Sequence, residues 1–236
     1  LMVGSEGTLG FIADITYNTV VEHPHRATGL YLFASASQAC DLASRLQSAP
    51  VDAAELLDQR SLDSVKGKPG LPLSFCDRDP QCTALLIETA APDATTLASQ
   101  IEELEAIVAG FAPIEQVTFT PDKTLATQLW AIRKATFPAV GAVRETGTTV
   151  IIEDVSFPSE ALAQGVQGLH ELFAKYEYDE AIIFGHALAG NLHFVFTQAF
   201  DNDEQIARYD AFMHDVAQLL FNITSGSVKC RPFFAK

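Results

Sequence analysis

Short apolar runs alternate with longer amphipathic stretches along this 236-residue sequence, and their order limits the possible folds more than any single motif does. Runs of a few apolar residues, or of alternating apolar and polar residues, predict strands, and apolar residues three or four positions apart predict helices. The predicted strands cover residues 11–20, 29–34, 83–89, 115–119, 149–155, 180–184 and 192–197. The predicted helices cover residues 35–46, 53–65, 93–109, 121–133, 158–176 and 202–220.

These elements do not follow the regular strand–helix–strand repeat of a Rossmann-type domain. An antiparallel sheet with helices packed on one face, an α+β arrangement of the ferredoxin-like kind, fits their order better. Residues 66–80 are rich in glycine and proline and are expected to form a loop. Hydrophobic residues make up 48% of the chain, enough for the core of one large domain or two small ones.

The chain is acidic, with a formal net charge of −15. Nucleic acids and anionic membranes are bound through clustered lysine and arginine, so this charge argues against both kinds of partner. A negative protein also repels small anions weakly. A site for an organic acid in this chain must therefore contain a cation of its own.

Four cysteines, Cys40, Cys76, Cys82 and Cys230, have spacings that match no zinc or iron–sulfur motif. Free thiols in a reducing cytosol explain them, so we expect a cytoplasmic protein. The sequence contains no signal peptide and no apolar run long enough to cross a bilayer. It does not begin with Met, and we expect it to be a fragment that lacks its N-terminal part.

The stretch FGHALAGNLHF contains His186 and His193. In one helix the two histidines would lie about 10.5 Å apart along the axis, too far to share a metal ion bound at about 2.0–2.1 Å. In a strand–loop–strand turn, which Gly185 and Gly190 favour, their Cβ atoms can lie about 4.5–5.5 Å apart. Two explanations then fit: an open metal site that a third ligand completes, or two ordinary histidines near a hairpin.

The first ten residues, LMVGSEGTLG, contain three glycines. Loops this rich in glycine let backbone N–H groups approach a bound group closely, often a phosphate. A flexible chain end is the other explanation for this composition.

Four stretches resemble, in order, motifs of the FAD-linked 2-hydroxyacid dehydrogenases, the family of D-lactate and D-2-hydroxyglutarate dehydrogenases. VGSEGTLGFI resembles the end of the family's FAD-binding domain, LWAIRKATFPAVGA its Leu-Trp-x-x-Arg helix, and VIIEDVSFP its Glu-Asp-Val-x-x-Pro strand. FGHALAGNLHF resembles its Gly-His-x-Gly-Asp-Gly-Asn-Leu-His loop. Within the family, the sequence of these motifs is most similar to that of large bacterial FAD-linked oxidoreductases that also carry iron–sulfur modules.

The resemblance divides the chain into three parts. It implies that residues 1–20 are the remnant of the end of a FAD-binding domain and that residues 21–225 form a FAD-linked oxidase C-terminal domain, the substrate or cap domain. Residues 226–236 would be an atypical, truncated tail. The whole protein would oxidise a D-2-hydroxy acid to a 2-oxo acid with FAD as cofactor. We expect the isolated fragment to be inactive and to have little affinity for FAD.

The resemblance also implies partners. These are a small 2-hydroxy acid, the upstream FAD-binding domain, an iron–sulfur module or other electron acceptor, and a second copy of the chain in a homo-oligomer. An acceptor in the inner membrane would place the protein at the membrane periphery. Two alternatives compete with this interpretation. One is a flavin oxidase of alcohols or phenols, which would not need paired histidines; the other is a non-catalytic ferredoxin-like binding or dimerisation domain.

Particular residues receive roles from the resemblance. Arg133 matches the arginine that binds the substrate carboxylate, which a guanidinium fork suits. His186 and His193 match a pair that binds zinc or a similar divalent ion, although one of them could instead act as a base. The candidates for contact with FAD are Gly4, Ser5, Gly7, Thr8, Glu153 and Asn191.

Simpler explanations exist for three of these residues. Arg133 could be a solvated charge on a helix beside Trp130, and Asn191 could be a turn residue that tolerates left-handed geometry. Glu153 and its neighbour Asp154 could be strand-end residues facing water, or carboxylates that orient an imidazole or approach the flavin edge.

The sequence departs from the family pattern in two places. Leu188 and Ala189 replace the Gly and Asp of the histidine loop. After GSVK (226–229) the family continues into a Glu-His-Gly segment, whose Glu supplies a further metal ligand, whereas this chain continues with CRPFFAK. Cys230 or water could replace that ligand, but we expect a shortened form with an incomplete metal site.

Overall fold

The structure, a computed structural model, describes residues 2, 5 and 7–225. Two of the expectations therefore concern residues outside the described part of the chain. These are the contact of Gly4 with FAD and the role of the tail 226–236, which includes Cys230.

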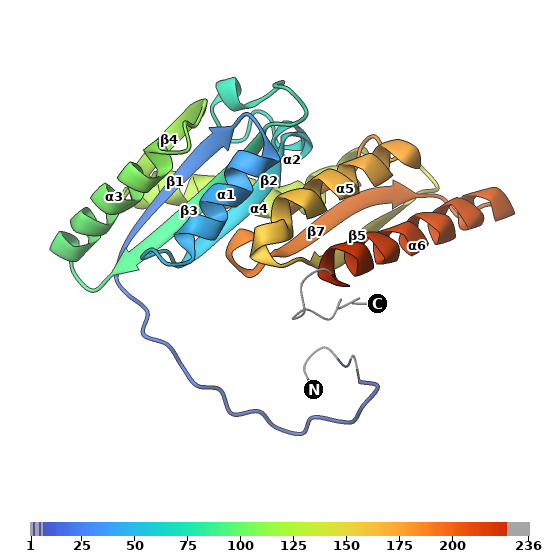
Figure 1. The fold of residues 1–236 in the computed structure, drawn as a ribbon, viewed down its shortest axis with the longest axis horizontal. Coiled ribbons are helices and arrows are strands. Elements are labelled where there is room, and N and C mark those ends of the chain that lie inside the picture. The colour runs from blue at the N-terminus through green and yellow to red at the C-terminus, as the bar shows by residue number, and fades with distance from the viewer. Residues whose placement is uncertain (1, 3–4, 6, 226–236) are drawn as a thin grey trace.

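A seven-stranded sheet forms the centre of the molecule, and each of its strand pairs is antiparallel (Figure 1). The strand order is β4-β1-β3-β2-β6-β7-β5. The strands are β1 (His25–Phe33), β2 (Ala53–Asp58), β3 (Thr83–Ala91), β4 (Glu115–Thr120), β5 (Thr149–Ser156), β6 (Ile182–His186) and β7 (Asn191–Gln198). The helices are α1 (Ala36–Leu46), α2 (Gln59–Ser64), α3 (Ala94–Ala109), α4 (Lys123–Val143), α5 (Leu162–Lys175) and α6 (Asp203–Ser225). The α+β class and the antiparallel sheet are confirmed.

The chain builds this sheet from two related units. The elements β1-α1-β2-β3-α3-β4, with the strand order β4-β1-β3-β2, make a ferredoxin-like unit. The elements β5-α5-β6-β7-α6 repeat the first five elements of this pattern. Pairing of β2 with β6 joins the two units into one sheet.

Helices cover both faces of the sheet. α1, α3, α5 and α6 lie on the front face in Figure 1, and their apolar residues share one core with Tyr31 and Phe33 of β1. α2 and α4 lie on the back face, where they pack on Leu30 and Leu32 of the same strand. The expected layer of helices on one face is therefore present, and α2 and α4 add a partial layer on the other. Strands covered on both faces are apolar on both, which explains the continuous run TALLIETAA of β3.

Side-chain caps begin five of the helices, including α6, where Asn202 Oδ1 accepts from the Gln205 N–H. Ser35, Asp58, Asp93 and Asp122 each accept a hydrogen bond from a backbone N–H of the first turn of the helix that follows. Such caps satisfy N–H groups that have no partner within the helix. The helix starts predicted near residues 35, 93 and 121 are thereby explained.

Two predicted elements are wrong. Residues 53–65 were expected to form one helix, but β2 and α2 divide this stretch. β2 lies between β3 and β6 near the middle of the sheet, and this pairing overrides the helical preference of AAELLD. Residues 11–20 form no strand, and their segment runs extended below the sheet in Figure 1, with Phe11 and Val20 each 92% exposed. A strand needs a neighbour, and this segment pairs with none within the described residues.

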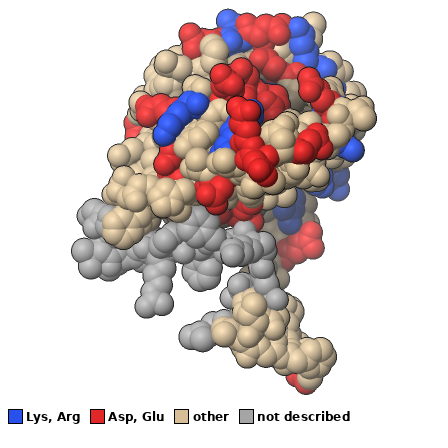
Figure 2. Space-filling view, turned by 90° about the vertical axis from the view of Figure 1, so that its right-hand side faces the viewer, with Lys and Arg blue, Asp and Glu red and all other residues tan. Residues whose placement is uncertain are grey.

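The surface is rich in carboxylates. Figure 2, which views the end of the molecule at the right of Figure 1, shows more acidic than basic side chains on that face. Among the described residues, no helix combines the length and the hydropathy that a bilayer span requires. Cys40, Cys76 and Cys82 are buried free thiols.

Candidate active site

A row of polar side chains crosses four neighbouring strands on the face that α4 partly covers. Glu55 on β2 is the cross-strand partner of His186 on β6, and His193 on β7 is the partner of Asp154 on β5. Above this row lies Arg133, which projects from the middle of α4 and contacts Glu55. Residues that are 131 positions apart in sequence thus meet in one place.

A tight hairpin brings the two histidines together. β6 ends at His186, a single 3-10 turn (Ala187–Ala189) follows, and β7 starts at Asn191. A side chain at Gly185 would overlap the backbone of Asn191 and lie 2.7 Å from the Cα of Leu192. The strand–loop–strand arrangement is therefore the one that forms, and it depends on the glycine.

The imidazole rings of His186 and His193 are close and nearly perpendicular. Their centroids are 5.3 Å apart and the planes meet at 86°. Each ring is held by a carboxylate at Nδ1: His186 by Glu55 at 2.6 Å, and His193 by Asp154. The His186 side chain is 52% exposed and that of His193 is 18% exposed. Because both Nδ1 atoms are occupied, the Nε2 atoms are the ones left for substrate or metal.

Arg133 is held in place rather than solvated. Its Nε donates a hydrogen bond of 2.7 Å to Glu55, its Cζ lies 4.3 Å from the centre of the Phe184 ring, and 13% of its side chain is exposed. Within the described residues, its two terminal nitrogens make no hydrogen bond or ion pair. A fixed guanidinium with two free N–H₂ groups can bind a carboxylate in a bidentate manner.

The donor set partly fits a divalent metal ion. Two imidazoles whose Nδ1 atoms are bound by carboxylates are the usual partners of a metal at Nε2. However, the described part of the chain contains no group of three or more histidine, cysteine or acidic side chains that could enclose an ion. The residues present therefore supply two ligands of a possible site, and the expected third ligand belonged to the undescribed tail.

Of the other candidate residues, Glu153 lies apart from this row, whereas Asn191 lies within it. Glu153 alternates with Asp154 along β5 and so faces the opposite side of the sheet, where it is near Tyr209. Asn191 is the cross-strand partner of His186 in the hairpin, and its side chain donates to the backbone carbonyl of Val155.

The described residues of the N-terminal glycine loop also lie apart. Ser5, Gly7 and Thr8 form an exposed or half-exposed turn in which the Thr8 N–H and hydroxyl both bond the Ser5 carbonyl, at 2.8 and 2.6 Å. No described hydrogen bond joins them to the histidines.

Sequence reasoning missed Glu55 and Phe184. Glu55 was assigned to a helix, although a single carboxylate within the apolar run AAELL is itself an unusual pattern for a buried strand. Phe184 pairs with His193 across the hairpin at a ring distance of 5.4 Å and supports Arg133 from below. It resembled an ordinary core residue in the sequence.

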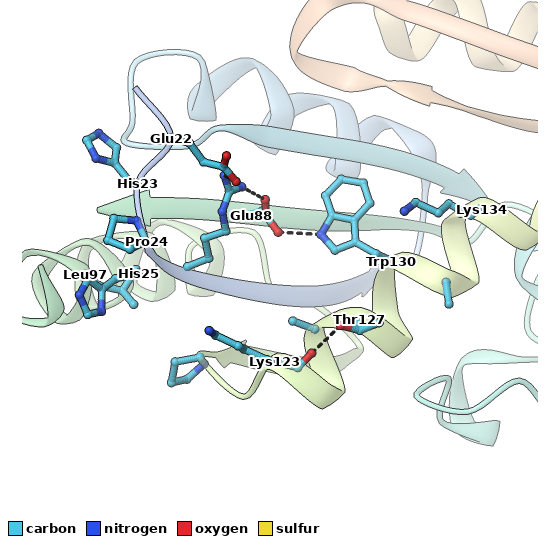
Figure 3. Close-up of a pocket in the computed structure, with 14 residues that line it drawn as sticks. Glu22, His23, Pro24, His25, Glu88, Leu97, Lys123, Thr127, Trp130 and Lys134 are labelled. Atoms are coloured by element: carbon cyan, nitrogen blue, oxygen red, sulfur yellow. Dashed lines mark hydrogen bonds and ion pairs between the residues drawn. The ribbon is translucent and has the colours of Figure 1, made fainter. Parts of the chain in front are cut away.

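A cleft lies beside the site, not at it. It has a volume of about 790 Å³ and is lined by residues 22–26 and by the first half of α4. Figure 3 shows Glu88 in its wall, hydrogen-bonded to Trp130 Nε1 at 2.7 Å. Arg26 binds the other oxygen of Glu88 at 2.8 Å. Trp130 and Arg133 are thus both tied to carboxylates of the sheet, and these two contacts fix α4 above it.

Apolar side chains remain exposed around the polar row. Ile152 shares its face of β5 with Asp154, and Phe137 lies one turn beyond Arg133 on α4. Both are more than 40% exposed. Apolar groups next to buried charges are typical of a surface that another domain or ligand covers.

Comparison with known proteins agrees with this geometry. A family model described as "FAD linked oxidases, C-terminal domain" matches residues 22–228. The chain is 31% identical over 215 residues to glycolate oxidase subunit GlcD of Bacillus subtilis, covering 89% of this chain and 43% of that protein. It is 26% identical over 199 residues to the mitochondrial D-lactate dehydrogenase (cytochrome) of Arabidopsis thaliana, covering 82% and 33%. The chain thus spans less than half the length of these relatives.

Solved structures share the fold. An alkyldihydroxyacetonephosphate synthase matches with a TM-score of 0.62 at 14% identity, over 86% of this chain and 40% of that one. The 4-ethylphenol oxidase of Gulosibacter chungangensis, solved with isoeugenol, matches with a TM-score of 0.52 at 10% identity, over 88% and 44%.

Proposed function

Because the chain belongs to the FAD linked oxidases, whose C-terminal domain it forms, we propose that it provides the substrate side of a site that oxidises a D-2-hydroxy acid to a 2-oxo acid. One observation carries this proposal. Arg133, which has two free N–H₂ groups among the described residues, contacts the same Glu55 carboxylate as His186. A carboxylate anchor and a proton acceptor are the two groups that such an oxidation requires of the protein.

Arg133 binds the carboxylate of the substrate. In a chain of net charge −15, a guanidinium that is mostly buried supplies the local cation that an organic acid needs. Its attachment to Glu55 and Phe184 keeps the fork in one orientation, which lowers the entropy cost of binding. The substrate hydroxyl then lies toward the histidines.

The imidazoles act on the hydroxyl proton. Because Glu55 and Asp154 hold the Nδ1 atoms, the Nε2 lone pair of one histidine accepts the proton as the C2 carbon is oxidised. FAD, when bound by the upstream domain, supplies the acceptor for the two electrons and the hydrogen from C2. A divalent ion such as zinc bound by His186 and His193 would lower the pKa of the same hydroxyl.

The upstream FAD-binding domain covers the exposed face around the site. The apolar side chains of Phe137 and Ile152 provide its contact area, and residues 1–20 belong to its end. We further propose a cytoplasmic protein that passes electrons to an iron–sulfur module or another acceptor and that forms a homo-oligomer. Relatives named as a glycolate oxidase subunit and a D-lactate dehydrogenase support small 2-hydroxy acids as the substrate class.

Flavin reduction in the full-length protein tests the proposal. Mixing the oxidised protein with D-lactate or glycolate under anaerobic conditions should bleach the flavin absorbance. Arg133→Met should raise the substrate concentration for half-maximal bleaching by about 100-fold or more, because a charge-assisted bidentate contact is lost. Lys134→Met is the matched control, since Lys134 is exposed on the same helix and makes no described ion pair.

Two results would contradict the proposal. The first is an equal effect of the Arg133 and Lys134 variants. The second is flavin that no small 2-hydroxy acid reduces, which would favour the non-catalytic binding or dimerisation domain.

A further inference from the structure

The carboxylate of Glu55 contacts two residues of the candidate active site at once. Its Oε1 lies 2.6 Å from His186 Nδ1, and its Oε2 lies 2.7 Å from Arg133 Nε. Only 7% of its side chain is exposed, so water competes little for either oxygen. No other carboxylate among the described residues joins a histidine and an arginine of this site.

The contact determines which nitrogen of His186 carries the hydrogen. A carboxylate that pairs with a guanidinium has acceptor oxygens only. Nδ1 of a neutral His186 must therefore be the donor to Glu55. Nε2 keeps its lone pair and presents it on the side of the ring away from Glu55.

The same carboxylate decides which nitrogens of Arg133 stay free. It binds Nε rather than the two terminal nitrogens, which remain unpaired among the described residues. A carboxylate that bound the terminal nitrogens instead would occupy the fork that a substrate needs. The Phe184 ring, 4.3 Å from Cζ, fixes the plane of the guanidinium.

We propose that Glu55 is a positioning residue that sets the His186 tautomer and the Arg133 orientation together. This role rests on the proposed function, in which Arg133 holds the substrate carboxylate and an imidazole accepts the hydroxyl proton. Glu55 does not touch the substrate in this scheme. It fixes the distance between the anchor and the acceptor, because both are bonded to one rigid group.

Asp154 is less suited to this role. It contacts Nδ1 of His193, but its side chain is 43% exposed, and it pairs with no lysine or arginine within the described part of the chain. Glu88 is a second carboxylate to compare with Glu55. It also ties α4 to the sheet, through Trp130, but it contacts none of the active-site residues.

The test uses Glu55→Gln in the full-length protein. A glutamine at this position can accept from Arg133 Nε only through its oxygen, and its N–H₂ then faces His186 Nδ1. That nitrogen must become an acceptor, so the hydrogen moves to Nε2. Long-range ¹H–¹⁵N spectra of protein labelled at histidine, assigned with His186→Gln, should show the Nδ1–H form in the wild type and the Nε2–H form in the variant.

The kinetic expectation follows because His186 Nε2, once it carries the hydrogen, has no lone pair to accept the substrate proton. Glu55→Gln should lower kcat by about 10–100-fold, the usual effect of removing a carboxylate behind an active histidine. KM should change less than about threefold, because the amide oxygen keeps Arg133 in place. Glu88→Gln, the control for removing a carboxylate beneath α4, should change neither kcat nor the tautomer.

The outcomes are distinct. Retention of the Nδ1–H form in Glu55→Gln, or the same change in Glu88→Gln, would overturn the role of Glu55. If Glu55→Gln does not fold, Glu55→Asp replaces it: an acceptor-only group should retain the Nδ1–H form, and its loss would equally overturn the role. The spectra need no substrate, so a wild-type protein that fails to oxidise 2-hydroxy acids would refute the proposed function without deciding this inference.

Discussion

Gly190 lies directly against the carbonyl oxygen of Phe157. Its own carbonyl accepts the N–H of Phe157 at 2.9 Å, and a Cβ built on Gly190 would overlap the Phe157 oxygen. The residue also has φ +67°, a left-handed conformation that glycine adopts without strain. This contact joins the histidine hairpin to the end of β5 and so brings β5, with Asp154, beside His193.

Gly190→Ala should therefore destabilise the chain strongly. We expect a loss of more than about 3 kcal/mol in the free energy of unfolding, or no folded protein, because backbone strain and overlap add. Gly147→Ala is the control, since Gly147 has φ +94° with nothing within 4 Å of a Cβ, and it should cost about 1–2 kcal/mol. Urea unfolding of both variants measures the difference, and equal losses would show that the Phe157 contact is unimportant.

Burial, and next the nearby Asp154 charge, raise the pKa of Glu153. A carboxyl whose folded-state pKa is raised stabilises the fold below the ordinary glutamate pKa, and this stability is lost as pH rises through the folded value. Glu153→Gln should therefore raise Tm at about pH 8, on the order of 1–2 °C, with the gain vanishing at about pH 4. Glu102→Gln, at an exposed position on α3, is the control for removing one surface carboxylate. A Tm lowered at pH 8 would refute the expectation.

The buried thiols should be unreactive in the folded chain. Burial, and next the Asp41 charge, raise the pKa of Cys40 to about 12, and burial also raises the pKa values of Cys76 and Cys82. Because the thiolate is the reactive form, a disulfide reagent at about pH 8 should label none of the three in a Cys230→Ser background. All three should react in guanidinium chloride. Rapid labelling without denaturant would show that this part of the core opens readily.

Zinc binding should depend on both histidines of the pair. His186→Gln and His193→Gln should each weaken binding to the full-length, chelator-treated protein by about 100-fold or more, because two imidazole ligands cannot be reduced to one without a large loss. His214→Gln on α6 is the control, since this residue is exposed and its helix packs on the opposite face of the sheet from the pair. Titration calorimetry gives the affinities. Unchanged binding in either site variant would remove the metal from the proposal.

Several elements could be predicted from local pattern alone. The run TALLIET and the apolar strands that flank the histidine loop are too apolar to be anything but buried, and Ser35, Asp93 and Pro121 signal helix starts. The turn between the histidines follows from Gly185 and Gly190. Each of these features can be predicted from residues that are close together in the sequence.

Other features could not be predicted in this way. The segment Ala53–Asp58 has helix-forming residues and becomes a strand because β3 and β6 pair with it. Residues 11–20 have the alternation of a strand but pair with none of the described strands, although β4 and β5 are both edge strands. Local alternation does not determine whether a segment finds a pairing partner.

The sequence by itself determined the α+β class, the hairpin that carries His186 and His193, and the arginine on its helix, because periodicity and glycine placement act over a few residues. Only the tertiary structure decided that Glu55 joins Arg133 to His186, since the three come from β2, α4 and β6. Hydrogen bonds between side chains so distant in sequence depend on strand register, and register is set by the packing of the whole sheet.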